Sequence, residues 1–443
     1  MRRGSASGRL GRGLALVCGA ALLVPAPAGA QAGFTTFQFN LSNPGARSMG
    51  FGGAFVALAD DATAAFANPA GLVQIIAPEV SLEGRSWSYS TPYTVGGRLS
   101  GEPSGFGLDT ISGLRFGVSE QDAAGLAFLS LVYPKGRWSW AFYRHRLSNF
   151  TFAGETQGLF AIPFPPDTGF RREGDRRLAT EYDIVGYGLS GAWQVADKLS
   201  VGLGAVYFEV GLSASERHFA FDSEERFFEA NSYLPARNFQ NVLFEIDESD
   251  WGMTAGFLWS PSARWRLGGT YREGPEVDDF RVTIRSGPSD PSVPVGTTLF
   301  AASSPLALPD TWGLGLSYRS ADDRLTLGLE WDRVEYSQIV ESITFATEAV
   351  VDDADELHAG AELVLLERRP VVALRAGAWL DPDHRLRLES SEATVDRAFF
   401  RRGTDEIHWS AGVGLVFRRF QIDLGVDVSD LVDTVSISTI YGL

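Results

Sequence analysis

Cysteine is almost absent from the 443-residue chain, and its one occurrence, Cys18, lies near the N-terminus. It falls in an apolar run, Leu14 to Val24, that follows four arginines and precedes Pro-Ala-Pro-Ala-Gly-Ala. This order is typical of a secretory signal peptide, so we expect residues 1–30 to be removed and Gln31 to begin the mature chain. Since that chain would contain no thiol, it would contain no disulfide.

Basic residues are in the minority. The chain has 38 Lys and Arg against 55 Asp and Glu, and removing the four leader arginines leaves a mature net charge of −21. We do not expect nucleic acid as a partner, because binding its phosphates needs a basic surface.

Long hydrophobic runs are also missing after residue 30, where no segment has the roughly 18 consecutive apolar residues that a membrane helix needs. The chain alternates instead. In Trp251–Trp259, Trp312–Tyr318 and Ile407–Phe417, large apolar residues take one parity and mostly small or polar residues the other. A period of two predicts β-strands with one apolar face. A membrane would therefore be crossed by strands.

Fourteen such segments can be placed from about residue 78 onward, and their connections alternate in length. Turns such as 134–136 are only a few residues long, whereas connections such as 213–249 and 274–308 are long and polar. Outer-membrane barrels combine short periplasmic turns with longer extracellular loops. We expect an all-β fold over residues 78–443: a transmembrane antiparallel β-barrel of about 14 strands in the bacterial outer membrane. The alternative is a soluble β-sandwich.

The barrel interpretation fixes the direction of particular side chains. Trp140, Phe257 and Val413 occupy the apolar parity and are expected to face lipid, while small and polar residues line the lumen. The last strand, Val435–Leu443, resembles the C-terminal strand by which outer-membrane barrels are recognised, although Leu443 replaces the usual final Phe. This implies the barrel-assembly machinery as a partner during biogenesis, with outer-membrane lipid and lipopolysaccharide as surroundings.

The stretch FVALADDATAAFANPAGL, residues 55–72, does not alternate. At 100° per residue its apolar side chains share one helical face, opposite Asp60 and Asp61. This predicts an amphipathic helix of about three turns that stops near Ala67, because Pro69 disfavours helical conformation at the residue before it. Such a helix is too short and too acidic to span lipid, so we expect residues 31–77 to form a small helical hatch inside the barrel.

A family resemblance rests on these residues. NPGARSMGFGGAFVALADDATAAFANPAGL, residues 43–72, closely resembles the N-terminal segment of FadL-type outer-membrane transporters of long-chain fatty acids and aromatic hydrocarbons, including the motif Asn68, Pro69 and Ala70. The resemblance implies a hatch that blocks the barrel, and an apolar ligand that binds first at an extracellular groove and then in the lumen.

The resemblance also implies how the ligand leaves. Movement of the N-terminal segment releases it, in part sideways through a gap beside an inward kink in the third strand. The predicted third strand, 137–148, contains neither Gly nor Pro, so the sequence does not locate such a kink. The implied function is passive uptake of hydrophobic small molecules, such as long-chain fatty acids or aromatic hydrocarbons. The alternative is a protein-secretion shuttle or anchor that carries no small ligand.

Aromatic residues supply the candidate ligand contacts. Some lie on the hatch and others in the connection 213–249, which is rich in aromatics for an extracellular loop and would offer a first capture surface. Both groups have the alternative role of simple packing. The candidates are Phe51, Phe55 and Phe66 on the hatch and Phe227, Phe228 and Phe239 in the connection.

Catalytic and metal-binding patterns are missing. The five histidines, at 145, 218, 358, 384 and 408, lack metal-ligand spacing, and the stretch around Ser190 misses the nucleophile elbow by one glycine. We therefore expect no enzyme activity, no catalytic residue, no cofactor and no metal. Acidic clusters such as Asp247–Asp250 could hold calcium, but none has the spaced pattern of a calcium loop, and solvated charge is the competing interpretation.

Overall fold

The structure is a computed structural model that describes residues 43–161, 171–221, 227–228, 233–344, 349–388 and 398–443. The predicted signal peptide and residues 31–42 of the predicted hatch lie outside these ranges. Within them, no helix has both the length and the apolar character needed to cross a bilayer.

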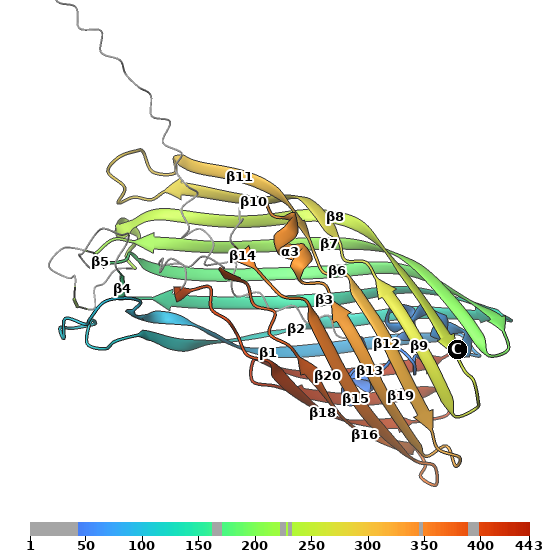
Figure 1. Cartoon of the computed structure of the whole chain (residues 1–443). Helices are drawn as coiled ribbons and strands as arrows, with labels where there is room; N and C mark the ends of the chain where they lie inside the picture. Colours follow the sequence, from blue (N-terminus) through green and yellow to red (C-terminus); the bar gives the residue numbers. More distant parts are fainter. Residues whose placement is uncertain (1–42, 162–170, 222–226, 229–232, 345–348, 389–397) are drawn as a thin grey trace, which may run out of the picture.

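A single closed antiparallel β-barrel of 14 strand positions forms the body of the molecule (Figure 1), as the alternation predicts. Two positions are each made of two segments, β9 with β10 and β11 with β12. In chain order the wall consists of β1 (Glu79–Arg98), β2 (Leu114–Lys135), β3 (Trp138–Thr156), β6 (Asp175–Ala196), β7 (Leu199–Phe219), β8 (Asn238–Trp259), β9 (Trp265–Arg272), β10 (Glu276–Ser286), β11 (Thr298–Ala307), β12 (Thr311–Arg319), β13 (Leu325–Val334), β15 (Ala354–Leu365), β16 (Val371–Asp381), β18 (Glu406–Val416), β19 (Phe420–Val428) and β20 (Val432–Gly442).

The last strand closes the barrel against the first. β20 pairs with β1 from Glu79 opposite Gly442 to Tyr89 opposite Val432. The C-terminus therefore lies at the end of the barrel that carries the short turns (Figure 1).

Short elements decorate the other end and the lumen. The wall is completed above by β4 (Leu159–Ala161) and β5 (Arg171–Arg172), with β14 (Ala349–Val350) paired to β17 (Arg387–Leu388). The described helical pieces are α1 (Ala46–Gly50), α2 (Ala64–Ala67), the 3₁₀ turns η2 (Pro69–Gln74) and η4 (Pro235–Arg237), and α3 (Ser337–Ser342).

The apolar parity faces outward. Trp140, Phe257 and Val413 are 51%, 37% and 36% exposed and lie on the exterior, as expected of lipid-facing positions. Ile437 and Tyr441 on the last strand are likewise exposed. The soluble sandwich is wrong, because its aromatic parity would have been buried.

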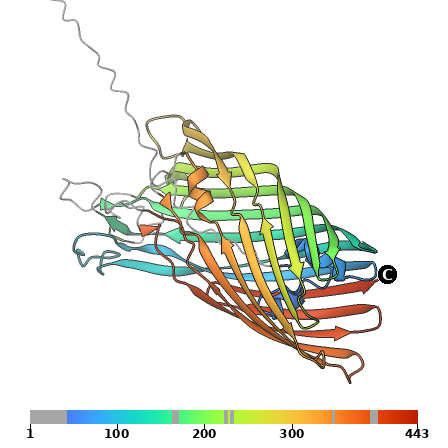
Figure 2. The ribbon, with the colours of Figure 1, turned by 45° about the vertical axis from the view of Figure 1, so that its right-hand side comes forward.

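The wall is taller on one side than the sequence predicts (Figure 2). The six long strands from β1 to β8 have 19 to 22 residues, whereas the wall strands from β12 to β20 have 9 to 12. The predicted connection 213–249 is therefore wrong in extent, because 213–219 continues β7 and 238–249 belongs to β8. These strand extensions contain both charged and apolar residues. Because outward-facing charged residues such as Glu209 and Glu245 are also typical of loops, the sequence made the extensions look like part of a loop.

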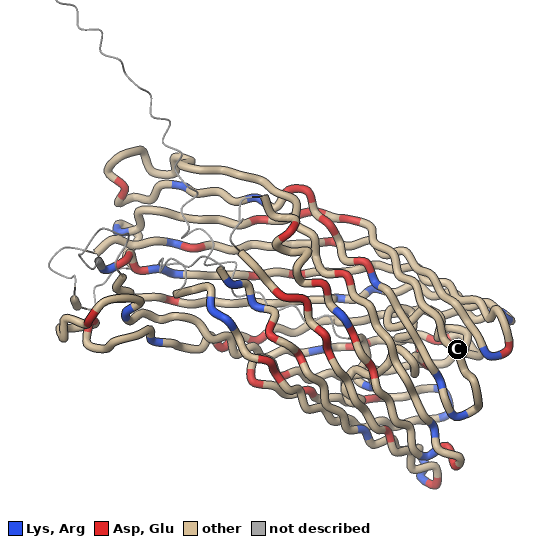
Figure 3. The backbone as a smooth tube through the Cα atoms, viewed as in Figure 1, with Lys and Arg blue, Asp and Glu red and all other residues tan. Residues whose placement is uncertain are grey.

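The lumen differs with height. Above the N-terminal segment it is filled by large buried aromatic and aliphatic side chains, including Phe128, Phe152, Phe208 and Phe244. At the level of the N-terminal segment the interior is small and polar, as expected, and serines and glycines of the wall contact the segment there. Charged positions of both signs also mark the short-turn end (Figure 3).

The wall has two discontinuities. β2 and β3 pair only from Lys135–Trp138 to Phe128–His145, and beyond this point β2 continues to pair with β1 alone and β3 with β6. β3 carries a bulge at the same height, where its register against β6 shifts between Arg146 and Ser148.

The second discontinuity interrupts two neighbouring strand positions. β9 ends before Gly274-Pro275 and β10 begins after it, while Pro309 separates β11 from β12. Carboxylates replace part of the ladder here. Asp250 accepts from the amide of Glu276 at 2.8 Å, and Glu248 accepts from the amide of Asp278 at 2.9 Å.

Candidate functional site

The motif Asn68, Pro69 and Ala70 docks directly on the barrel wall. Asn68 is fully buried, and its side-chain amide donates to the carbonyl oxygens of Val56 at 2.9 Å and of Phe257, on β8, at 3.0 Å. Its Oδ1 accepts from the amide of Ala70 at 3.1 Å, which caps η2, and Pro69 fills the first position of that turn, where no amide is needed. The motif thus joins the N-terminal segment to itself and to the wall.

Glycines of the wall allow this close approach. A Cβ at Gly256 would lie 2.2 Å from Asn68 Oδ1, and one at Gly202 would lie 2.4 Å from the amide nitrogen of Ala70. Both distances are shorter than any contact a side chain tolerates, so the wall at these positions must have no side chain.

Serine hydroxyls of the wall satisfy carbonyl groups of the segment. Ser190 on β6 donates to Ala65 O at 2.8 Å, and Ser200 on β7 donates to Ala70 O at 2.8 Å. Ser190, the residue of the near-miss nucleophile motif, therefore serves here as a docking donor. Backbone carbonyl groups of the segment that have no partner within a helix thus accept hydrogen bonds from wall side chains. These bonds allow the segment to keep an irregular backbone inside the lumen.

The predicted three-turn helix is wrong. Within residues 55–72 only Ala64–Ala67 is α-helical, and residues 55–63 form turns and irregular backbone, with Ala59 at a φ of 29°. Asp61 accepts from the amide of Thr63 at 3.0 Å, a local bond that competes with helix. Asp60 instead forms ion pairs with Arg266 and Arg319 of the wall. The hydrogen bond of Asp61 and the ion pairs of Asp60 together outweigh the helix propensity of this Ala-rich stretch.

An ion-pair cluster surrounds Arg47 of α1. Its guanidinium lies 2.7 Å from Asp60, 3.0 Å from Asp61 and 3.2 Å from Glu362 of β15. Asp60 is also 3.1 Å from Arg319 and 3.6 Å from Arg266, both on the wall. None of these side chains is more than 34% exposed. The adjacent carboxylates that the sequence singled out therefore bind arginine inside the barrel.

The cluster shifts the acidity of the two aspartates in opposite directions. Burial by itself raises the pKa of Asp60, but the guanidinium groups of Arg47 and Arg266 outweigh burial and hold that pKa below its usual range. For Asp61 burial outweighs Arg47 and the bonds from Thr63, so its pKa is raised. Asp60 is thus the carboxylate that the docked arrangement stabilises in its charged form.

We expect loss of the Asp60 charge in acid to weaken docking of the N-terminal segment. A carboxyl whose pKa is lower when docked stabilises docking above the pKa of the released carboxyl, about 3.9, and this contribution is lost as the pH falls through the docked value. Bilayer conductance should therefore rise when the pH is lowered below about 4.

The variant Asp60→Asn isolates this contribution. Its conductance should already be higher at pH 7 and should change less with acid than that of the unmodified chain. Asp61, whose pKa is raised, acts in the opposite sense in both chains, so the difference between them reports on Asp60. An acid response as large in Asp60→Asn as in the unmodified chain would contradict this assignment.

The three candidate phenylalanines of the N-terminal segment occupy two environments. Phe51 and Phe55 are buried in a small cluster with Ala54 and Leu58, and Phe51 lies against Gly328 and Gly360 of the wall. Phe66 instead contacts the rings of His145 and Tyr143 on β3, with centroids 4.3 and 6.1 Å apart. Of the three, Phe66 is the one that reaches the apolar part of the lumen.

A small apolar cavity of about 30 Å³ lies beside Phe66. Its walls come from both discontinuities: Leu147 is the bulge residue of β3, and Gly274, Pro275 and Pro309 belong to the interrupted strands. The remaining apolar lining is Ile184, Val206, Phe208 and Leu308. Sequence reasoning missed the β3 bulge, because neither glycine nor proline marks it.

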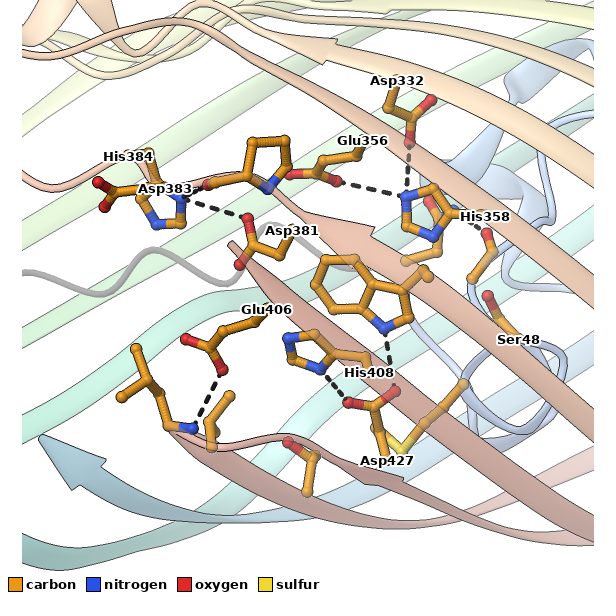
Figure 4. A pocket seen from close by; sticks show the side chains of 18 of the residues that line it. Ser48, Asp332, Glu356, His358, Asp381, Asp383, His384, Glu406, His408 and Asp427 are labelled. Carbon is orange, nitrogen blue, oxygen red and sulfur yellow. Dashed lines mark hydrogen bonds and ion pairs between the residues drawn. The ribbon is translucent and has the colours of Figure 1, made fainter. Parts of the chain in front are cut away.

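A second, polar cavity of about 90 Å³ is lined in part by Ser48 and Gly53 of the N-terminal segment (Figure 4). Its lining includes carboxylates and imidazoles on neighbouring strands, among them Asp332, Glu356, His358, His408 and Asp427. Sequence reasoning treated these histidines one by one and missed that strand pairing brings them together.

The candidates of the predicted loop do not form one surface. Phe239 lies in β8 with its ring 5.8 Å from that of His218. Phe227 contacts Phe106 and Phe160, with ring centroids 6.3 and 6.1 Å away, while Phe228 is 58% exposed. A capture role for Phe227 and Phe228 stays a prediction, and Phe239 stands apart from them on the wall.

These features define the class of protein: an outer-membrane β-barrel whose lumen is occupied by its own N-terminal segment. The family described as "Outer membrane protein transport protein (OMPP1/FadL/TodX)" matches residues 166–357, a part of the chain separate from the N-terminal motif. This match makes residues 166–357 similar to a family of outer-membrane transport proteins.

Solved structures share the fold. A Pseudomonas aeruginosa FadL homologue is 16% identical with a TM-score of 0.62, and 92% of this chain covers all of that one. The CymD monoaromatic hydrocarbon channel is 16% identical, with a TM-score of 0.53 and coverage of 92% and 99%. The Pseudomonas putida toluene transporter TodX is 14% identical, with a TM-score of 0.51 and coverage of 91% and 98%. No match was found among curated proteins.

Proposed function

We propose that this barrel takes up hydrophobic small molecules across the outer membrane by passive diffusion, with residues 31–77 acting as a hatch. The observation that carries the proposal is the apolar cavity beside Phe66, placed between the N-terminal segment and the discontinuity at the β3 bulge. An apolar ligand suits this cavity, because most of its lining is apolar, with Thr254, Thr311, Arg272 and Glu273 as the polar members. The proteins of similar fold that are named as toluene and monoaromatic hydrocarbon channels support the same substrate class.

The route follows from the wall. Above the cavity the lumen is packed with apolar side chains, which suit a hydrophobic ligand that enters from outside and moves by side-chain rearrangement. At the cavity, β2 and β3 no longer pair. Side chains of β1 cross behind this gap: Tyr89 donates to Asn149 O at 2.9 Å, and Tyr93 packs on Phe152 with ring centroids 5.6 Å apart. We infer that the ligand leaves sideways here when these side chains and the hatch move.

Both a long-chain fatty acid and an aromatic hydrocarbon fit this chemistry. Aromatic hydrocarbons are favoured by the small size of the cavity, about 30 Å³ in the closed state. None of the comparisons supports the secretion-anchor alternative.

Filling the cavity should stop uptake without unfolding the barrel. Val206 is buried and faces the cavity, whereas Leu203 on the same strand is 69% exposed on the exterior. Val206→Trp should lower liposome uptake of labelled toluene by about 5- to 150-fold, since overpacking costs about 1–3 kcal/mol and each 1.4 kcal/mol of added barrier gives a factor of ten. Leu203→Trp, which adds the same ring to the lipid face, should leave uptake unchanged.

The substrate class and the hatch are tested in the same liposomes. Toluene and a labelled long-chain fatty acid are compared in the unmodified chain, in Val206→Trp and in a form lacking residues 31–50. The proposal expects uptake of at least one solute and faster uptake after the deletion. Absence of uptake of both solutes in all forms, with barrels shown to be folded, would reject transport and favour the anchor.

A further inference from the structure

Three aromatic residues form a ladder across the wall of the polar cavity. His358 on β15, Trp379 on β16 and His408 on β18 occupy directly opposed positions in consecutive strands. Their rings are nearly parallel, with centroids 5.1 Å apart for His358 and Trp379 and 3.8 Å apart for Trp379 and His408. The stack fixes the plane of each imidazole at the cavity surface (Figure 4).

A backbone group of the N-terminal segment fixes the tautomer of His358. Its Nδ1 lies 2.9 Å from the carbonyl oxygen of Gly52, and since a carbonyl only accepts, Nδ1 carries the proton. Nε2 then faces Glu356 Oε2 at 3.3 Å and Asp332 Oδ2 at 3.9 Å. In the neutral ring this nitrogen presents a lone pair to two carboxylates. The arrangement calls for a positive charge between the three groups.

The two carboxylates are themselves placed against each other. Asp332 on β13 and Glu356 on β15 are directly opposed partners in the antiparallel ladder, a position where like charges destabilise a sheet. Glu356 and His358 are two residues apart and therefore share the inner face of β15. Strand pairing thus gathers a ligand set that has no spacing signature in the sequence.

Asp332 is the second independent sign of a ligand. It is only 5% exposed, and its carboxylate makes no hydrogen bond to any residue that the structure describes; its nearest cationic partner is the His358 ring at 3.9 Å. Burying a carboxylate without hydrogen bonds is costly unless a cation compensates it. One oxygen points toward the His358 Nε2 and Glu356 side of the cavity (Figure 4).

We propose that Asp332, Glu356 and His358 bind one divalent transition-metal ion, with Zn²⁺ as the best match to the donor set. The ligand atoms of the three residues lie within 4.8 Å of one another. Metal–ligand bonds of about 2.0–2.2 Å place neighbouring tetrahedral ligands roughly 3.4 Å apart. The 3.3 Å separation between His358 and Glu356 already fits this spacing, and the 3.9 Å separation between His358 and Asp332 needs Asp332 to move by about half an ångström. Water in the adjoining cavity completes the coordination.

The surroundings match those of metal-bound histidines. Such a histidine almost always donates its other ring N–H to a carbonyl or carboxylate, which orients the ring and raises its basicity, and Gly52 O provides this group here. The N-terminal segment therefore takes part in the site, and an ion bound to Nε2 strengthens the hold of His358 on that segment. Imidazole with carboxylate oxygen suits zinc and its neighbours in the first transition row.

The test uses Co²⁺ as a spectroscopic substitute for Zn²⁺ on the purified full-length barrel after EDTA treatment. We expect one Co²⁺ per barrel, visible absorption bands of low-symmetry four- or five-coordinate cobalt, and competition by Zn²⁺. The isosteric variants Asp332→Asn and Glu356→Gln, together with His358→Gln, should each weaken binding by more than about 100-fold, because even changes outside the ligands cost 10- to 100-fold.

A matched control comes from the same cavity. His408 stacks on Trp379 and contacts Asp427 at 2.6 Å but lies outside the three-residue set, so His408→Gln should keep Co²⁺ binding. Trp379 provides a second readout, since bound Co²⁺ should quench its fluorescence, and Trp379→Phe should remove the quenching while retaining the absorption bands.

Two results would overturn the proposal. One is the absence of Co²⁺ binding at millimolar concentration in the EDTA-treated barrel, which would mean that a protonated His358 alone pairs the carboxylates. The other is binding that His408→Gln abolishes and Asp332→Asn leaves intact. Heat-modified gel mobility confirms folding of each variant, and if one of the three ligand variants fails to fold, the other two decide. Because binding is measured without transport, the outcome is separate from the proposed uptake.

Discussion

Gly256→Val should unseat the N-terminal segment from the wall. A Cβ at this position lies 2.2 Å from Asn68 Oδ1, so the motif must withdraw and lose its bond to Phe257 O on the wall. Overpacking and the lost hydrogen bond together cost about 3 kcal/mol, roughly a 150-fold shift toward the released state. Planar-bilayer recordings of Gly256→Val should show frequent or continuous ion conductance where the unmodified chain is mostly closed.

The control for this change is another wall glycine. A Cβ at Gly84 has one neighbour, Ile437 Cγ2 at 3.9 Å, and its strand partner Ile437 is exposed on the outside. Gly84→Val adds the same side chain to the lipid face and should leave conductance low. If Gly256→Val folds and remains as closed as Gly84→Val, the close contact is not what seats the segment.

Removing the charge of Arg47 is expected to have an equally large effect. Arg47→Met leaves Asp61 without its arginine partner in a buried site, and it removes one of the two arginines that pair with Glu362, which keeps Arg375 at 2.6 Å. Breaking a buried ion pair by deleting one member costs about 3–5 kcal/mol. Docking of the segment should weaken by this amount. The measurement uses Ser48→Cys as a reporter, because Ser48 is 1% exposed and Cys18, the only native cysteine, lies in the predicted signal peptide.

The rate at which maleimide labels the introduced thiol then reports the fraction of molecules in which the N-terminal segment is released from the wall. Labelling should be slow in Ser48→Cys alone and faster by at least about 100-fold when Arg47→Met is added, as 3 kcal/mol implies. Arg137→Met is the matched comparison, since Arg137 pairs with Asp197 at 3.2 Å on an exposed turn, where an ion pair is worth about 1 kcal/mol or less. Equal labelling rates in the Arg47 and Arg137 variants would show that the buried cluster does not hold the segment.

The barrel was predictable because lipid imposes a strict two-residue period. Every wall strand that crosses the apolar band must place residues such as Phe257 outward and small residues inward, so parity alone gives strand number and direction. The same logic fails above the band. Above the band the outward-facing residues include charged ones such as Glu209 and Glu245. Since charged residues are also common in loops, the alternation of these strand extensions is not recognisable in the sequence.

The site was only partly predictable. The Asn-Pro-Ala motif and the paired aspartates were visible as departures from alternation. Their partners, Phe257 O, Arg319 and Glu362, lie hundreds of residues away and become neighbours only when the register of the closed barrel is known. The β3 bulge had no marker residue, and the Asp332–Glu356 pair depends on register between strands.

The interrupted wall has a mechanical consequence. Where Gly274-Pro275 and Pro309 break adjacent strands, amides of Glu276 and Asp278 end on flexible carboxylates rather than on the carbonyls of a continuous ladder. Regions with fewer backbone bonds open at lower free energy than the rest of a fold. The wall thus has a compliant seam at the height of Phe66, along which β10 and β11 can separate from β9 and β12 at lower free energy than continuous strands would part.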